Sequence, residues 1–215
     1  MGQVIEPDNV CGVSHTNYVT MSSVMAKELG RPRDRRIDDA VLDATVKLLG
    51  EVGYAALSVD AIAKQAGTSK PAIYRRWPSK AHLVHEAAFP AGIAADLPDT
   101  GSLAGDVRAM VRDTVAVLST PAARAALPGL LGEMTADATL HSALLDRFAD
   151  VLGPGLHARL DAAATRGELR ADVTATDLTE VITGIALLAA LTRSAAPDDD
   201  WIDRNTTLIL KGIGA

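Results

Sequence analysis

The chain has 215 residues, of which 48% are apolar and 22% are charged, a composition that excludes a fully disordered chain. Its single cysteine, Cys11, excludes an internal disulfide framework and a multi-cysteine zinc site. The longest apolar stretch, Val181 to Leu191, contains a threonine and a glycine and is shorter than the roughly 18 residues that cross a bilayer. We therefore expect a globular, intracellular protein with no transmembrane helix and no membrane partner.

The formal net charge of −6 is unevenly distributed. Residues 31–85 carry ten basic and six acidic side chains, whereas residues 86–215 carry ten basic and eighteen acidic side chains. A basic module joined to an acidic body suggests that one end of the protein faces a polyanion. On charge alone, a chance asymmetry on a solvated surface explains the pattern equally well.

Residues 1–30 lack hydrophobic periodicity and have no secretory signal pattern. We expect them to form a disordered N-terminal arm, and Met21 and Met25 offer later start sites. The basic run from Arg31 to Arg36 follows. A disordered basic tail is the simpler interpretation of this run, and contact with the backbone or a groove of a polyanionic partner is the alternative.

The first periodic segment spans residues 37–52, where apolar side chains recur every three or four residues and so share one face of an α-helix. Gly53 is expected to end this helix in the left-handed conformation, which glycine adopts at little cost. The hydroxyl of Ser58 can then cap a short second helix that extends to Gln65.

A tight turn at Gly67 separates the second helix from a third. Thr68 or Ser69 would cap this third helix, and Pro71 falls in its first turn, where a missing N–H is tolerated. A fourth helix is expected over residues 79–87, again with a serine at its start.

The pattern stays helical to the end of the chain, and no strand alternation or internal repeat is evident. The residues Gly153-Pro154-Gly155 should kink or split the longest of these later helices. The segment at about 176–195 is apolar nearly all round, so it must be buried in a core or against another subunit. The sequence predicts an all-α fold of about nine helices, the later ones at about 103–118, 122–137, 139–165, 176–195 and 201–213.

The second and third helices, with the glycine turn between them, have the pattern of a helix-turn-helix that inserts one helix into a DNA groove. Small or apolar residues occupy the positions where the two helices must cross: Ala61, Ile62, Ala66 and Ile73. The outward positions of the third helix can meet phosphates and base edges: Ser69, Lys70, Ala72, Arg75 and Arg76. Tyr74 adds a hydroxyl that can donate to a phosphate oxygen.

Residues 35–95, and above all Gly53 to Lys80, resemble the N-terminal domain of the TetR/AcrR family of transcriptional regulators. The segment Arg166-Gly167-Glu168-Leu169-Arg170 also resembles the C-terminal region of many members. The chain departs from the family at Leu49 and Trp77, where phenylalanine is commoner. Both residues are apolar, and we interpret Trp77 as a core aromatic.

The resemblance implies an N-terminal three-helix DNA-binding domain over residues 31–80 and a helical effector-binding and dimerisation domain over residues 81–215. Lys70 and Tyr74 match positions that commonly touch the DNA backbone, and Lys80 matches a lysine that often grips a phosphate. Taken singly, these charges could be ordinary solvated side chains. The DNA-binding residues are predicted to be Ser58, Thr68, Ser69, Lys70, Pro71, Ala72, Tyr74, Arg75, Arg76 and Lys80.

The resemblance also implies a cytoplasmic, nucleoid-associated homodimer that pairs through residues of about 176–213 and binds a palindromic double-stranded operator. A repressor released by a small apolar ligand is the expected function, and a DNA-binding regulator without an effector is the alternative. The candidate ligand-binding residues are Phe89, Met110, Thr114, Met134 and Phe148.

Enzymatic and metal-dependent functions find little support in the sequence. His82 and His85 have a spacing that could hold a metal, but no third ligand is apparent, so we expect no metal site. No nucleophile elbow, phosphate-binding loop or dinucleotide fingerprint occurs, so we expect no cofactor and no enzymatic activity. The helices at about 103–165 are expected to enclose a small-molecule cavity. An all-α enzyme that uses this cavity is the rival hypothesis, and turnover would be its test.

Overall fold

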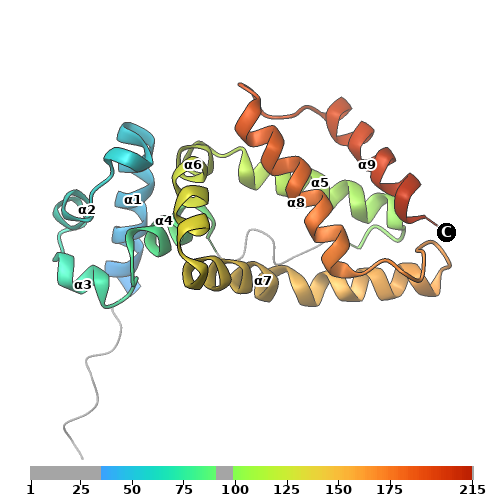
Figure 1. Ribbon diagram of the computed structural model, residues 1–215, viewed down its shortest axis with the longest axis horizontal. Helices are drawn as coiled ribbons and strands as arrows, with labels where there is room; N and C mark the ends of the chain where they lie inside the picture. The colour runs from blue at the N-terminus through green and yellow to red at the C-terminus, as the bar shows by residue number, and fades with distance from the viewer. Residues whose placement is uncertain (1–34, 91–98, 215) are drawn as a thin grey trace, which may run out of the picture. The chain divides into compact units, whose positions relative to one another are not determined.

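The computed structural model describes residues 35–90 and 99–214, with only the backbone described for residues 143–155. Within this part the chain forms nine α-helices, and its one β-like feature is an isolated bridge between Leu169 and Gly214 (Figure 1). The all-α prediction is therefore confirmed. The predicted arm at residues 1–30, Cys11 and the first part of the basic run, residues 31–34, lie outside the described residues.

Helix α1 spans Arg35–Ala56, and its regular geometry breaks at Gly53 (φ 73°, ψ 170°). The predicted interruption at this glycine is thus present. Its ψ lies far from the roughly +30° to +60° of the left-handed helical region, so Gly53 is not the left-handed cap that we expected. This backbone region is essentially restricted to glycine, and the chain continues for one further turn that carries the buried Tyr54.

Three short helices follow, α2 (Val59–Gln65), α3 (Lys70–Tyr74) and α4 (Lys80–Ala88). Each begins behind a serine whose hydroxyl accepts a hydrogen bond from a backbone N–H three residues on, at 3.2–3.3 Å. These caps satisfy N–H groups that the helices leave free. Ser69, and not Thr68, is the cap of α3, and the preceding turn contains Gly67 with φ 66°. The capping serines are Ser58, Ser69 and Ser79.

The remaining helices are α5 (Leu103–Leu118), α6 (Pro121–Ala136), α7 (Ala138–Thr165), α8 (Ala175–Thr192) and α9 (Asp199–Ile213). Helix α7 continues through residues 153–155, so of the expected kink or split at Gly153-Pro154-Gly155 the split was wrong, and a kink stays a prediction. A proline inside a helix removes one backbone hydrogen bond, and the flanking turns of this 28-residue helix continue on both sides of it.

The buried apolar side chains form two clusters. The first joins α1–α4 to α5, α6, α7 and α8, and Leu49, Ile62 and Leu83 are among its fully buried members. The second lies among α5, α7, α8 and α9, around Val107 and Ile182. The first cluster extends across residue 80, which means that the helices on either side of this predicted domain boundary pack together.

Helix α8 as a whole is long and apolar enough to cross a membrane. Helices α5 and α6, which meet at a bend of 82°, would also be long and apolar enough if the pair were counted as one span. The apolar stretch considered in the sequence is only the C-terminal part of α8. The inner face of the helix packs against α5, with Leu178 and Ile182 buried in the second cluster. One such helix is weak evidence of a membrane span, because helices of soluble proteins can have the same composition, and 33% of α8 is buried here.

Candidate nucleic-acid interface

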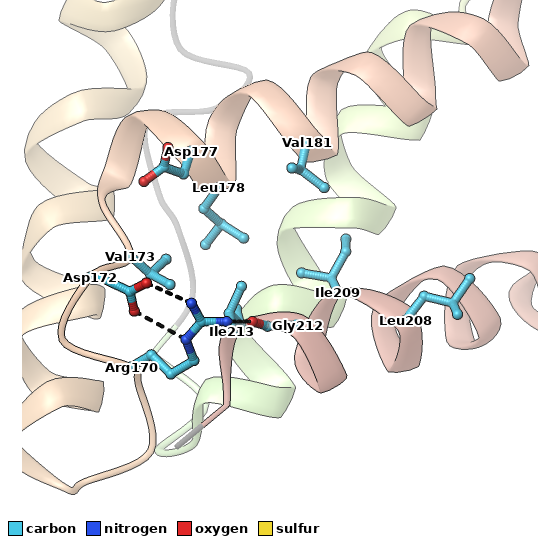
Figure 2. Close-up of a pocket in the computed structure, with 10 residues that line it drawn as sticks. All are labelled: Arg170, Asp172, Val173, Asp177, Leu178, Val181, Leu208, Ile209, Gly212 and Ile213. Atoms are coloured by element: carbon cyan, nitrogen blue, oxygen red, sulfur yellow. Dashed lines mark hydrogen bonds and ion pairs between the residues drawn. The ribbon is translucent and has the colours of Figure 1, made fainter.

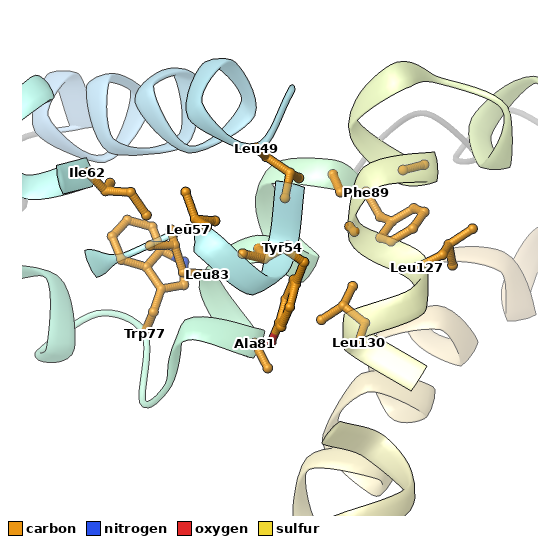
Figure 3. Close-up of a cluster of buried hydrophobic side chains, with 14 of the residues drawn as sticks. Leu49, Tyr54, Leu57, Ile62, Trp77, Ala81, Leu83, Phe89, Leu127 and Leu130 are labelled. Carbon is orange, nitrogen blue, oxygen red and sulfur yellow. The ribbon is translucent and has the colours of Figure 1, made fainter. Parts of the chain in front are cut away.

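A small apolar core beneath α2 and α3 supports the helix-turn-helix. Ile62 of α2 (Figure 3) and Ile73 of α3 have exposed fractions of 0% and 1%, and both belong to the first cluster. Trp77 is 5% exposed, and its Nε1 donates to the Glu86 carboxylate at 3.0 Å. The structure therefore places Trp77 in the core, as interpreted from the sequence. Burying Ile73 turns the opposite face of α3 outward.

The outward face of α3 brings together most of the predicted DNA-binding residues. Tyr74 is 43% exposed, although large hydrophobic side chains are usually buried more fully. The hydroxyl groups of Ser58 and Ser69 already accept from backbone N–H groups, although each oxygen retains a proton that it can donate. Ser58, Ser69, Lys70, Pro71, Tyr74 and Arg75 are exposed, and Thr68, Ala72, Arg76 and Lys80 are partly buried.

Lys70 is paired with a carboxylate that the sequence analysis did not assign to the site. Its Nζ lies 2.8 Å from Oδ2 of Asp60 on α2. This hydrogen bond, followed by the attraction between the two charges, raises the pKa of Lys70 above its ordinary value. Both side chains are exposed, so water screens the pair and a phosphate oxygen can compete for the ammonium group.

The two adjacent arginines of α3 have different environments. Arg75 is exposed, whereas the guanidinium of Arg76 forms an ion pair with Asp38 near the start of α1 and also donates to the backbone carbonyl of Ala72. The Arg76 side chain is only 17% exposed. It therefore ties the end of α3 to α1, and Arg75 is the arginine that is free to approach a base edge. DNA contact by either residue stays a prediction.

Lys80 lies on α4 and is folded over a residue that the sequence analysis did not select. Its Nζ is 4.1 Å from the centre of the Tyr54 ring and donates to the Tyr54 carbonyl at 3.2 Å. An ammonium group above an aromatic face is attracted by the ring quadrupole. No sequence motif predicted this contact, because the two residues are 26 positions apart and belong to different helices.

The predicted effector contacts do not share one cluster. Phe89 and Met134 belong to or pack against the first cluster, and Met110 belongs to the second. Thr114 is partly buried one turn beyond Met110 on α5, and the side chain of Phe148 lies outside the described part of the structure. Whether these residues contact a ligand stays a prediction.

An open hollow of about 430 Å³ lies between α8, α9 and the segment that precedes α8 (Figure 2). Arg170 crosses one end of it, bound to the carboxylate of Asp172 at 2.6 Å and to the Gly212 carbonyl. The hollow includes none of the predicted effector contacts and lies in the region predicted to form the dimer interface. It is lined by Arg170, Asp172, Val173, Asp177, Leu178, Val181, Leu208, Ile209, Gly212 and Ile213.

Comparisons with known proteins agree on one family. Residues 41–87 match the family of bacterial regulatory proteins named tetR, and residues 97–209 match the tetracyclin repressor-like C-terminal domain. The HTH-type transcriptional regulator Rv1556 of Mycobacterium tuberculosis is 32% identical over 168 residues, which cover 75% of this chain and 80% of that protein. The DNA-binding transcriptional repressor TetR of Mycobacteroides abscessus is 34% identical over 173 residues, 77% of this chain and 87% of that protein.

A solved structure shows the same fold. The TetR family transcription regulator SCO0332 superimposes with a TM-score of 0.61 and 30% sequence identity, over 82% of this chain and 98% of that protein. The helix-turn-helix described above lies inside the N-terminal family match, and α5 to α8 lie inside the C-terminal match. The chain therefore belongs to the TetR family of DNA-binding bacterial transcriptional regulators.

Proposed function

We propose that the protein is a homodimeric repressor that binds a palindromic operator through α3 of each protomer and is released by a small apolar ligand. The observation that carries the DNA-binding part is the arrangement of α3, with Ile73 buried beneath it and Lys70, Tyr74 and Arg75 exposed. A short helix held in this way can enter the major groove while its basic side chains meet the phosphates. Its place of action would be the cytoplasm, on the nucleoid.

The proposed dimer interface is the apolar face that α8 and α9 leave exposed. Leu188 of α8 and Leu208 of α9 have exposed fractions of 62% and 65%, and Val181 and Leu191 of α8 are also exposed. A second copy of this chain would cover these side chains and relate the two α3 helices by a two-fold axis. The operator would then have two half-sites about 34 Å apart, one turn of the double helix.

Binding to duplex DNA and its dependence on salt test this proposal directly. An operator would first be selected from random duplex DNA, and its affinity measured by fluorescence anisotropy over a range of salt concentrations. Lys80→Ala should weaken binding to all sequences to a similar degree and reduce the salt slope by about one unit per phosphate contact, or about two per dimer. Arg112→Ala, which removes an exposed charge on α5, is the matched control and should leave the slope unchanged.

The repressor assignment draws on the relative from Mycobacteroides abscessus, whose name describes a DNA-binding transcriptional repressor. Release by a ligand requires a compound that binds better to the conformation with incorrectly spaced α3 helices. A thermal-shift screen against small apolar compounds, repeated with operator present, would identify such a ligand. A compound that stabilises the free protein and weakens operator binding supports release by a ligand. If no compound in the screen has either effect, the result supports the alternative of a regulator without an effector.

A further inference from the structure

Tyr54 is a buried aromatic residue that packs against α6 at a glycine. It is 8% exposed, and its ring lies on Gly129 of α6, where a Cβ atom would come within 2.0 Å of the ring carbon Cδ1. The ring reaches from the last turn of α1 toward α6, next to Leu130 (Figure 3). Glycine at position 129 is what allows the ring to contact the α6 backbone so closely.

A second contact with α6 fixes the other end of the same side chain. The Tyr54 hydroxyl donates to Oε1 of Glu133 at 2.6 Å. Gly129 and Glu133 are four residues apart, so they lie on one face of α6. Burial, followed by the hydrogen bond and the charge of Glu133, raises the pKa of Tyr54 well above its usual range. The hydroxyl thus stays protonated and donates at all physiological pH values.

The same ring is also in contact with Lys80. The ammonium group lies above the ring at 4.1 Å and donates one hydrogen bond to the Tyr54 carbonyl at 3.2 Å. An ammonium group has three donors, so at least one is left for a phosphate oxygen. A lysine that is already fixed in place also loses less side-chain entropy when it binds. Tyr54 therefore contacts both α6 and the lysine that is proposed to grip DNA.

We propose that Tyr54 is a positioning residue that makes the DNA contact of Lys80 depend on the position of α6. This inference rests on the proposed function, and it specifies how the position of α6 would regulate DNA binding. A shift of α6 withdraws Glu133 from the hydroxyl and Gly129 from the ring, and Lys80 then loses its support. A ligand that binds better to the shifted state lowers DNA affinity by its difference in affinity for the two states. Met134, a predicted effector contact, is the next residue after Glu133 on α6.

A double-mutant cycle on DNA affinity tests this connection. Tyr54→Phe removes the hydroxyl but retains the ring, and Glu133→Ala removes its acceptor. Each should weaken operator binding about five- to tenfold, within the roughly 2- to 30-fold range in which single residues of a coupling network act. Glu133→Gln retains an oxygen that can accept the same hydrogen bond, so its affinity should stay within about twofold of that of the unaltered protein. In the Lys80→Ala background, Tyr54→Phe and Glu133→Ala should have no further effect.

The outcomes separate this inference from the proposed function. If the unaltered protein shows no salt-dependent duplex binding, or if Lys80→Ala leaves the binding unchanged, the Lys80 contact is refuted and this inference with it. If Lys80→Ala lowers the salt slope but the Tyr54 and Glu133 variants lose only thermal stability, the inference alone is refuted. Equal losses of affinity with and without Lys80 refute it as well, because Tyr54 would then act without the lysine.

Gly129→Ala tests the second contact with α6 by a different route. The added methyl group has to displace the Tyr54 ring or α6 itself, so a loss of affinity similar to that of Glu133→Ala is expected. Gly132→Ala is the matched control, since a Cβ at this position of the same helix meets no atom within 4 Å. Unchanged DNA affinity in a folded Gly129→Ala protein would count against the inference.

Discussion

The helix-turn-helix and the α8–α9 pair expose side chains of different chemistry. Helices α2 and α3 have only seven and five residues, and they expose cations above their small apolar core. Helices α8 and α9 have eighteen and fifteen residues, and they expose leucines on one side while the other packs in the second cluster. Each region therefore exposes a surface whose chemistry indicates its partner. The cations of the helix-turn-helix suit a polyanion, and the exposed leucines of α8 and α9 suit another apolar surface.

The largest expected effect comes from placing a charge on the apolar surface. Leu188→Glu should convert the dimer into a monomer, because it places a charge in the apolar interface. The monomer should stay folded, because the replaced side chain is exposed and the core is unchanged. A monomer loses the second α3 helix, so operator affinity should fall by about 100-fold or more. Light scattering after size-exclusion chromatography and anisotropy measure the two quantities.

The control for that variant is Val52→Glu, the same kind of change at an aliphatic residue of α1 that is 49% exposed. It should remain a dimer. If Leu188→Glu also remains a dimer with unchanged affinity, the α8–α9 surface is not the interface and the comparison fails on that side.

A smaller effect is expected from a truncation in the apolar core beneath α3. Ile73→Ala removes a side chain that is 1% exposed, and its free energy of unfolding should fall by about 2–5 kcal/mol in urea titrations. Because α3 loses its main anchor, the folded protein should also bind operator more weakly. Leu156→Ala of α7, in the second cluster and outside the proposed interface, is the matched control, with a similar loss of stability but little change in the affinity of the folded dimer. Equal losses of operator affinity would contradict the separation of the two regions.

The smallest expected effect concerns the helix caps in acid. The serines that cap α2 and α3 do not titrate in this range, whereas α8 begins with a capping box of Thr174 and Asp177. Hydrogen bonds from the side chain and then the backbone of Thr174 hold the pKa of Asp177 below its ordinary value of 3.8. This carboxylate stabilises the fold above pH 3.8, and its contribution is lost as the pH falls through the lowered pKa.

Asp177→Asn should therefore make the thermal midpoint depend less on pH in this acidic range. Identical profiles for Asp177→Asn and the unaltered protein would show that the acid sensitivity arises elsewhere.

Much of the local structure could be predicted because its causes lie within a few residues. Ser58 and Ser69 accept hydrogen bonds from N–H groups three residues on, and the turn between α2 and α3 has a positive φ at Gly67. The outcome at Gly53 was less predictable. A glycine signals that the helix breaks but does not specify the value of ψ, which is set by where the following turn packs.

The sequence by itself determined most of the helices, the serine caps of α2 and α4, the basic module and the apolar character of α8, since these depend on side chains that are near neighbours along the chain. The pairing of Lys70 with Asp60, of Arg76 with Asp38 and of Tyr54 with Glu133 was decided only by the tertiary structure. Tyr54 and Glu133 are 79 residues apart, and their contact depends on how closely α6 approaches the end of α1. Helix periodicity places a residue on a face of its own helix, but which helix covers that face is fixed by the packing of the whole core.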